Sequence, residues 1–241
     1  MNFRNAIFTF LCCVIAISFL ILMVNPLTKL SIVVTTDNVT YTPTLIIDAG
    51  HGGEDGGAVS DNGILEKDIN LNISNQTADL FNFLGFDVIK TRNQDTSLSN
   101  DGDTVRSRKV ADMKKRLEIF NSSEKNVIIS IHQNKFTESK YHGTQIFYSP
   151  NNENSKILAE NIKSMVKTLL QPENERECKA SDSGIYLLKN THNPALIVEC
   201  GFLSNIDECN MLNTNSYQKQ ISYSIAMGFL NYYNTNLQEV N

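Results

Sequence analysis

The sequence predicts an α/β fold: a single domain with a mainly parallel sheet, helices on both faces and a functional site at the carboxyl ends of the strands. Short apolar runs rich in β-branched residues alternate with longer segments of helical periodicity, which is typical of a parallel sheet covered by helices. About 200 of the 241 residues follow an apolar N-terminal segment. That length is enough for one core and hardly enough for two.

The expected elements follow one another from residue 44 to residue 233. Buried strands are expected where apolar residues run without interruption, at 44–48, 86–91, 127–131, 144–148 and 195–198. Helices are expected where apolar residues recur three and four positions apart, at 66–84, 104–121, 154–170 and 215–233. Gly85 ends the first helix. The third helix is expected to bury one face made of Ile157, Leu158, Ile162, Met165 and Leu169.

Composition excludes two classes of protein. The net charge is −5, with 41% hydrophobic and 20% charged residues, which describes a globular protein. The acidic balance argues against a nucleic-acid partner, because a phosphate-binding surface is basic. Cys178, Cys200 and Cys209 follow the N-terminal segment, and three cysteines cannot all pair. A disulfide framework is therefore not expected, and Cys200 should be a small buried side chain.

Residues 6–24 form an uncharged apolar run preceded by Arg4. A helix of this length matches the roughly 30 Å hydrocarbon core of a bilayer, and a positive flank is typical of an exported protein. A buried core helix is disfavoured, because the run is apolar on all sides and terminal. We expect an uncleaved anchor in residues 1–28 rather than a cleaved signal peptide, since the run is long and lacks a small-residue cleavage site.

This N-terminal segment predicts where the rest of the chain lies. Residues 29–42 are expected to be a linker or an edge strand, followed by the globular domain at 43–236. Whether the segment is an anchor or a signal, that domain should lie outside the cytoplasm, membrane-anchored or secreted.

Polar residues follow three of the expected strands. His51 comes after the strand at 44–48, His132 after the strand at 127–131, and Glu199 after the strand at 195–198. Ligands of open α/β sheets bind outside the carboxyl ends of the strands. These three side chains can therefore converge at one edge of the sheet.

A second carboxylate, Glu66, begins the helix expected at 66–84. Its spacing from Ile69 and Ile73 puts it on the buried face, where a carboxylate is costly unless it is paired or binds a metal. Two imidazoles and one carboxylate suffice to hold a catalytic zinc ion with one position left for water, and the other carboxylate can act as general base. The spacing leaves open which glutamate has which role.

Other residues near these motifs have simpler expected roles. Glycines beside His51 let the backbone turn sharply and approach a ligand: Gly50, Gly52 and Gly53. A phosphate-binding loop is disfavoured, since no Gly-Lys-Ser/Thr follows. Glu54 and Asp55 are expected in a solvated loop. His142 and His192 are expected in loops, at the surface or in a substrate cleft.

Four segments together resemble the zinc-dependent N-acetylmuramoyl-L-alanine amidases of the amidase_3 type: IIDAGHGG at 46–53, LEKDIN at 65–70, SIHQN at 130–134 and VECGFLSN at 198–205. The resemblance covers residues 43–234. It implies that His51, Glu66 and His132 bind Zn²⁺ and that Glu199 is the catalytic carboxylate of a domain at 43–236. It also implies the substrate, the amide between N-acetylmuramic acid and L-alanine in peptidoglycan. The residue after the family's motif histidine is often small, whereas here it is Gln133.

Further segments resemble the sporulation-associated branch of this family, the germination-type cortex amidases: YHGTQIFY at 141–148, IYLL at 185–188 and ECG at 199–201. This implies removal of stem peptides from spore cortex, the first step toward muramic-δ-lactam, with the forespore intermembrane space as a location. Two alternatives remain, a catalytically silent wall-binding scaffold and a zinc peptidase or deacetylase acting on another wall substrate. The intact site positions count against the first, and the sequence around Glu199 counts against the second. An activating protein partner is left open.

Overall fold

The computed structural model describes residues 42–182 and 184–236, which contain a six-stranded mixed sheet. The strand order across the sheet is β2-β1-β3-β6-β4-β5. In chain order the strands are β1 (Thr44–Ala49), β2 (Val88–Lys90), β3 (Asn126–Asn134), β4 (Gln145–Tyr148), β5 (Lys179–Ala180) and β6 (Ala195–Phe202). The predicted α/β class and the predicted single domain with a mainly parallel sheet are confirmed.

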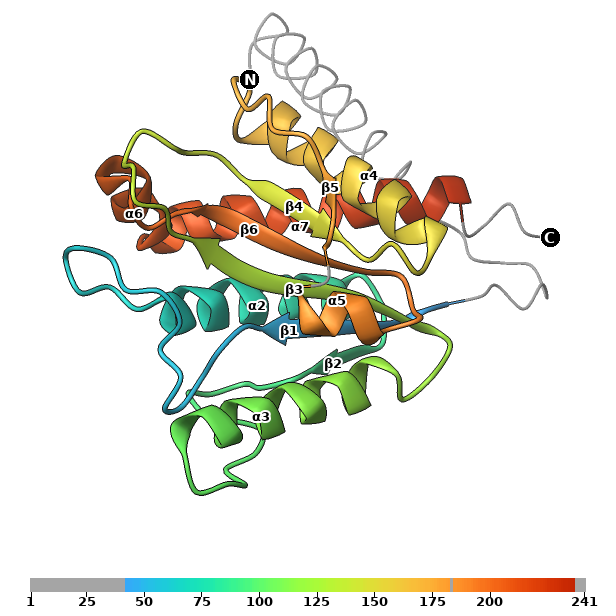
Figure 1. Cartoon of the computed structure of the whole chain (residues 1–241). Helices are drawn as coiled ribbons and strands as arrows, with labels where there is room; N and C mark the ends of the chain where they lie inside the picture. Colours follow the sequence, from blue (N-terminus) through green and yellow to red (C-terminus); the bar gives the residue numbers. More distant parts are fainter. Residues whose placement is uncertain (1–41, 183, 237–241) are drawn as a thin grey trace, which may run out of the picture. The chain divides into compact units, whose positions relative to one another are not determined.

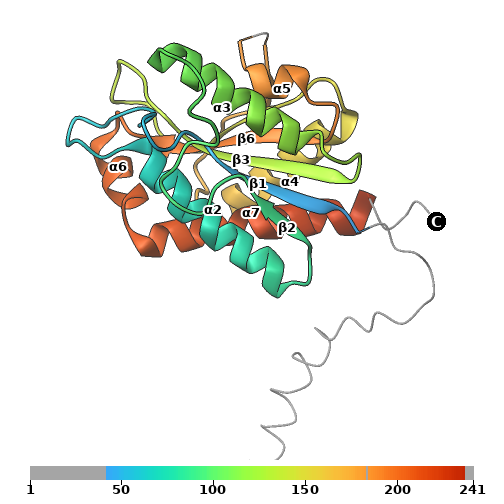
Figure 2. The same cartoon turned by 90° about the horizontal axis from the view of Figure 1, so that it is seen from below.

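Helices cover both faces of this sheet (Figure 2). In chain order they are α2 (Glu66–Phe83), α3 (Val105–Phe120), α4 (Glu153–Leu169), α5 (Tyr186–Asn190), α6 (Ile206–Leu212) and α7 (Asn215–Asn236). Helices α2, α4 and α7 pack on one face around the larger apolar core, and α3 and α5 pack on the other face around a smaller one. The expected burial on two faces is therefore confirmed.

The register of the strands brings their carboxyl ends to one edge. β1 is parallel to β2 and β3, and β3 is parallel to β6. β4 is antiparallel to β6, and β5 is parallel to β4. The loops after β1, β3 and β6 therefore lie at one end of the sheet, on the left in Figure 1.

Most element boundaries lie within two residues of those expected. Helix α3 begins at a capping box in which the Thr104 hydroxyl accepts a hydrogen bond from the Ser107 N–H at 3.1 Å. Gly85, with a φ of 87°, follows the C-cap of α2 as expected.

The buried face predicted for the helix at 154–170 is partly wrong. Ile157 and Leu169 are 38% and 49% exposed. The buried face consists instead of Ser155, Leu158, Ala159, Ile162 and Val166. It is shifted around the helix because the backbone of α4 packs directly against α7, where a Cβ on Gly228 would come within 2.4 Å of the Ile162 Cα.

Residues 1–41 are outside the described chain. The expected membrane segment at 1–28 and, apart from residue 42, the expected linker at 29–42 belong to that part. In the part that the structure describes, no helix has the length and apolar character needed to span a bilayer.

Candidate metal and catalytic site

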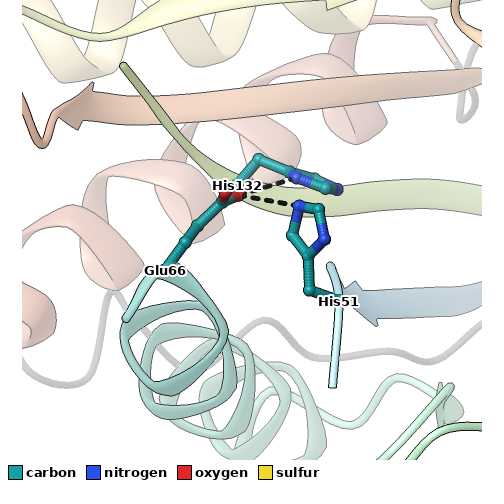
Figure 3. Close-up of side chains that lie close together, drawn as sticks. All are labelled: His51, Glu66 and His132. Carbon is teal, nitrogen blue, oxygen red and sulfur yellow. Dashed lines mark hydrogen bonds and ion pairs between the residues drawn. The ribbon is translucent and has the colours of Figure 1, made fainter. Parts of the chain in front are cut away.

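Three polar side chains from separate elements meet at the carboxyl ends of the strands (Figure 3). His51 follows β1, Glu66 is the first residue of α2, and His132 lies in β3. One donor atom of each lies within 4.8 Å of the other two. The Glu66 Oε1 atom is 3.0 Å from His132 Nδ1 and 3.3 Å from His51 Nε2. Two imidazole nitrogens and a carboxylate oxygen at these separations can hold a metal ion.

Glu66 is fixed in position by hydrogen bonds from the backbone and from a buried amide. Its Oε2 accepts the Ala58 N–H at 2.8 Å, and its Oε1 accepts the Gln133 N–H and the Asn70 amide, both at 3.1 Å. Burial raises the pKa of Glu66, but hydrogen bonds from His132 and His51 outweigh it and hold the pKa well below its usual range. The carboxylate is therefore ionised and aimed at the two imidazoles.

His51 is held by Asp55 in a conformation that is rare for a residue other than glycine. Its φ is 61°, and its Nδ1 atom is hydrogen bonded to Asp55 Oδ2 at 2.8 Å. Lys109 contacts the other oxygen of Asp55 at 2.7 Å. Burial lowers the pKa of His51, but the bonds to Asp55 and Glu66 outweigh it and raise the pKa to about 9. The expectation that Asp55 lies in a solvated loop is wrong, because this carboxylate orients the imidazole.

Two glycines leave room for the cluster. A Cβ on Gly50 would lie 2.2 Å from His132 Cε1, and a Cβ on Gly57 would lie 2.6 Å from Glu66 Oε2. Any larger residue would therefore displace one of the clustered side chains.

The sharp turn predicted beside His51 is present, with positive φ at Gly52 and Gly53. The close contact at Gly50 is with the His132 side chain. Nothing in the sequence indicates the role of Gly57.

Two buried arginines hold the backbone that presents His51. Arg116 donates to the carbonyls of Ala49 at 2.8 Å and His51 at 2.7 Å, and Arg92 donates to those of Ala49 and Gly50, each at 2.9 Å. Both arginines are under 5% exposed. Three consecutive carbonyls are thus fixed by guanidinium groups, which stabilises the unusual turn at His51.

Asp48 balances the charge of Arg116 inside the fold. The two form a buried ion pair, and Asp48 also accepts hydrogen bonds from Thr91 Oγ1 at 2.7 Å and Ser130 Oγ at 2.5 Å. Arg116 also donates from Nε to Asp112 Oδ2 at 2.7 Å. Burial raises the pKa of Asp48, but Arg116 outweighs it and keeps the pKa below its usual value. Asp48 therefore acts on the site through Arg116, whose charge it neutralises, and it does not belong to the metal-ligand cluster.

Glu199 lies on the neighbouring strand, beside the cluster. Its Cα is paired with that of His132 across β3 and β6. Its Oε2 atom is buried and has no hydrogen-bond partner among the described residues. Burial raises the pKa of Glu199 to about 7. A carboxylate with an unpartnered buried oxygen and a pKa near neutrality is suited to accept and donate a proton.

The remaining sequence candidates lie outside the cluster. His142 and His192 are exposed, and each engages a neighbour through its backbone carbonyl. Cys200 is fully buried and free, as expected, and Cys178 and Cys209 are free as well. Gln133 is buried beneath the site, where its amide donates to Asn70 Oδ1 at 3.1 Å. It therefore completes the network that holds Glu66.

Comparisons with known proteins agree with this arrangement. The family model for N-acetylmuramoyl-L-alanine amidases (Amidase_3) matches residues 45–231. The germination-specific N-acetylmuramoyl-L-alanine amidase of Bacillus subtilis is 36% identical over 190 residues, which are 78% of this chain and 79% of the relative.

Solved structures show the same fold. The CwlD amidase of Clostridioides difficile, solved in complex with the GerS lipoprotein, superposes with a TM-score of 0.78 and 40% identity, covering 81% of this chain and all of that one. An N-acetylmuramoyl-L-alanine amidase of Clostridium difficile 630 superposes with a TM-score of 0.71 and 28% identity, covering 81% of this chain and 99% of that one.

Proposed function

Since this chain belongs to the family of N-acetylmuramoyl-L-alanine amidases, we propose that it cleaves its substrate with a zinc ion held by His51, Glu66 and His132 and with Glu199 as the catalytic carboxylate. The chain is an enzyme of this family, and its reaction is hydrolysis of the amide between N-acetylmuramic acid and L-alanine in peptidoglycan. The observation that carries the proposal is the meeting of three donors from separate elements beside a carboxylate, Glu199, whose Oε2 atom is buried and unpartnered among the described residues.

The residues present fit zinc. The cluster offers two nitrogens and one oxygen, a ligand set that catalytic zinc sites use together with an open fourth position. Asp55 holds the far nitrogen of His51, as carboxylates commonly do for metal-binding imidazoles. When bound, zinc would supply Lewis-acid chemistry, polarising the scissile carbonyl and making a nearby water molecule more acidic.

The proton transfers fall to Glu199. In its ionised form the carboxylate accepts a proton from the attacking water, whose oxygen forms a bond to the carbonyl carbon. The same carboxyl group then gives that proton to the L-alanine nitrogen as the carbon–nitrogen bond breaks. The lactyl group leaves as a carboxylic acid and the stem peptide leaves with a free amine. Burial raises the pKa of Glu199 to about 7, which suits both directions of transfer.

The pH profile tests this role. We expect kcat/KM to fall about tenfold per pH unit on the acidic side of a midpoint at or below about 7, because protonated Glu199 cannot accept a proton and a bound cation lowers its pKa further. Steady-state rates of peptide release between pH 4.5 and 9, with zinc kept saturating at every pH, measure the profile. The residual activity of Glu199→Gln should lack this limb. An unchanged acidic limb in that variant would assign the ionisation to another group.

Removal of the metal should destabilise the fold. Ligands from three elements are tied together by the ion, so at zinc concentrations about 1,000-fold above Kd the stabilisation is about 4 kcal/mol, or roughly 8–16 °C in Tm. Calorimetry with and without chelator measures this loss. Because the pKa of His51 is raised to about 9, zinc must displace a proton, and its affinity should rise with pH up to that value. Equal Tm values for zinc-loaded and chelated protein would contradict the ligand assignment.

The proposal extends to biological setting. We propose spore cortex peptidoglycan as the substrate and muramic-δ-lactam formation as the outcome, supported by the similarity to a germination-specific amidase. The similarity to an amidase solved in complex with a lipoprotein supports a protein partner of that kind. The cell-wall relatives imply action outside the cytoplasm. The catalytic domain at 43–236 and an anchor at 1–28 are proposed from the sequence alone.

One digest separates this function from the alternatives. Purified cortex treated with the zinc-loaded enzyme should release peptides that begin with L-alanine, detected by mass spectrometry. A peptidase would cut within the peptide and a deacetylase would release acetate. Either of these products in place of L-alanine-terminated peptides would overturn the proposal.

A further inference from the structure

Two buried amide side chains lie directly behind the proposed metal ligands. Asn70 comes four residues after Glu66 in α2, so helical spacing puts both side chains on the same face of the helix. Gln133 follows His132 in β3, and because successive residues of a strand point to opposite faces, its side chain points away from the face of His132. Asn70 is fully buried and Gln133 is 3% exposed. The Gln133 Nε2 atom donates to Asn70 Oδ1 at 3.1 Å, which joins the two amides.

Asn70 connects the carboxylate of Glu66 to the backbone that presents His51. Its Nδ2 atom donates to Glu66 Oε1 at 3.1 Å and to the carbonyl oxygen of Gly50, the residue before His51, at 3.2 Å. Both of these acceptors are oxygens, so only the N–H end of the amide fits between them, and both of its hydrogens are used. The Asn70 Oδ1 atom must therefore face away from Glu66, where it needs a donor of its own.

Gln133 supplies this donor and leaves its own oxygen without a partner. Because its Nε2 atom faces Asn70, the Gln133 Oε1 atom is buried with no hydrogen-bond partner among the described residues. A buried oxygen without a partner destabilises the folded state. Gln133 therefore adds little net stability, since it satisfies one buried oxygen and leaves another unsatisfied. What remains is its effect on the orientation of the Asn70 amide.

We propose that Asn70 and Gln133 are positioning residues that set the affinity of the site for zinc by holding Glu66 in place. The inference rests on the proposed function, in which Glu66 is a zinc ligand together with two histidines. Hydrogen bonds to a metal-binding side chain fix its orientation, and their loss typically weakens metal binding about 10- to 100-fold. Without the Gln133 amide, nothing among the described contacts holds the Asn70 amide with its oxygen turned away from Glu66.

Variants of Gln133 separate the effect of the amide from that of side-chain volume. Methionine has nearly the length and volume of glutamine but donates no hydrogen bond, whereas alanine lacks both. We expect Gln133→Met and Gln133→Ala to raise the Kd for zinc by a similar factor of about ten, measured by competition with a chromophoric chelator. Wild-type affinity in Gln133→Met would overturn the proposal, because side-chain volume alone would then suffice.

The melting temperatures of the same metal-free variants show that affinity and stability are separate. Gln133→Met should keep a Tm close to that of wild type, because it exchanges one unpartnered buried oxygen for another, Asn70 Oδ1. Gln133→Ala should melt at a lower temperature, because it leaves a cavity. Equal losses of zinc affinity at unequal Tm are therefore expected. Affinity that falls only in the variant that loses Tm would contradict the positioning role.

Asn70→Ala tests whether Gln133 acts through Asn70. This variant removes the hydrogen bond to Glu66 itself, so we expect the Kd for zinc to rise toward 100-fold. Adding Gln133→Met to it should raise the Kd no further. A further tenfold rise in the double variant would show that Gln133 acts independently and would overturn the proposed pairing. If Asn70→Ala does not fold, the two Gln133 variants decide the proposal alone.

Ser222→Ala is the matched control. Ser222 is fully buried, and its hydroxyl donates to the carbonyl of Ile73 at 3.2 Å, about two turns along α2 from Glu66. We expect this variant to lower the Tm of the metal-free protein and to leave the Kd for zinc unchanged. A Kd that rises in Ser222→Ala in step with the loss of Tm would mean that zinc affinity only follows the stability of α2, which would overturn the positioning role.

The same titrations separate this inference from the proposed function. Loss of zinc binding in Glu66→Gln together with wild-type affinity in Gln133→Met would overturn the positioning role alone. A wild-type protein that binds no zinc, or a Glu66→Gln variant that binds it as tightly as wild type, would overturn the ligand assignment and this inference with it.

Discussion

Replacing Glu199 with glutamine should lower kcat by about 10²–10⁴-fold while leaving the zinc content at one ion per chain, because glutamine keeps the shape of the side chain but cannot take up a proton. The Glu199 Oε2 atom has no hydrogen-bond partner among the described residues, so the substitution breaks no bond there. Peptide release at saturating zinc and elemental analysis of the same samples measure both quantities.

Glu66→Gln is the matched comparison, since it removes the charge of the other carboxylate in the same site. Glu66 contacts His51 Nε2 and His132 Nδ1, and an amide in its place is a weaker ligand. This variant should lose zinc first and activity through that loss, with partial recovery at high zinc. If Glu199→Gln lost the metal while Glu66→Gln kept metal and turnover, the two assigned roles would be exchanged.

The stability of the metal-free Glu199→Gln protein provides an independent control. In the folded wild type the pKa of Glu199 is raised to about 7, above its ordinary 4.5. The folded state is therefore favoured by protonation below about pH 4.5, and this contribution is lost as the pH rises through 7. The variant should gain Tm over wild type at pH 8 and not at pH 4.5. Loss of Tm at both values would mean that Glu199 supports the fold.

The sequence predicts the site residues at the strand ends, but it does not predict the residues that hold them in position. His51, His132 and Glu199 follow long apolar runs, so strand direction alone predicts that they meet. The helical spacing of Glu66 predicts its burial. Arg92 and Arg116 could not be assigned, because each reaches carbonyls more than forty residues away in the chain, and nothing in a local pattern indicates that direction.

Short elements cannot be predicted from the sequence for a related reason. β5 contains two residues and exists only through pairing with β4, and α5 and α6 are too short for helical periodicity. A carboxylate in a glycine-rich loop is ordinarily solvated, so the sequence does not predict that Asp55 contacts His51. Its contact with His51 depends on the positive φ of that residue, which the sequence does not reveal.

Arg116→Met should be the most destabilising substitution near the site, at about 3–5 kcal/mol at neutral pH, because it leaves the fully buried Asp48 carboxylate without its cation. It also frees the carbonyls of Ala49 and His51. Chemical denaturation of the metal-free protein measures the loss. Arg108→Met is the control, since Arg108 pairs with Glu54 at the surface, where solvent screens the pair, and its loss should leave the free energy of unfolding nearly unchanged.

Two further measurements identify the cause of that loss. The double variant Asp48→Asn with Arg116→Met should recover part of the stability, because no buried charge is then left unpaired. It should not recover zinc affinity, since the His51 carbonyl still lacks its donor at 2.7 Å and the left-handed turn is free to relax. Full recovery of zinc binding in the double variant would show that Arg116 serves only to neutralise Asp48. If the double variant recovers neither stability nor zinc affinity, the whole effect of Arg116→Met comes from the lost hydrogen bonds to the carbonyls of Ala49 and His51.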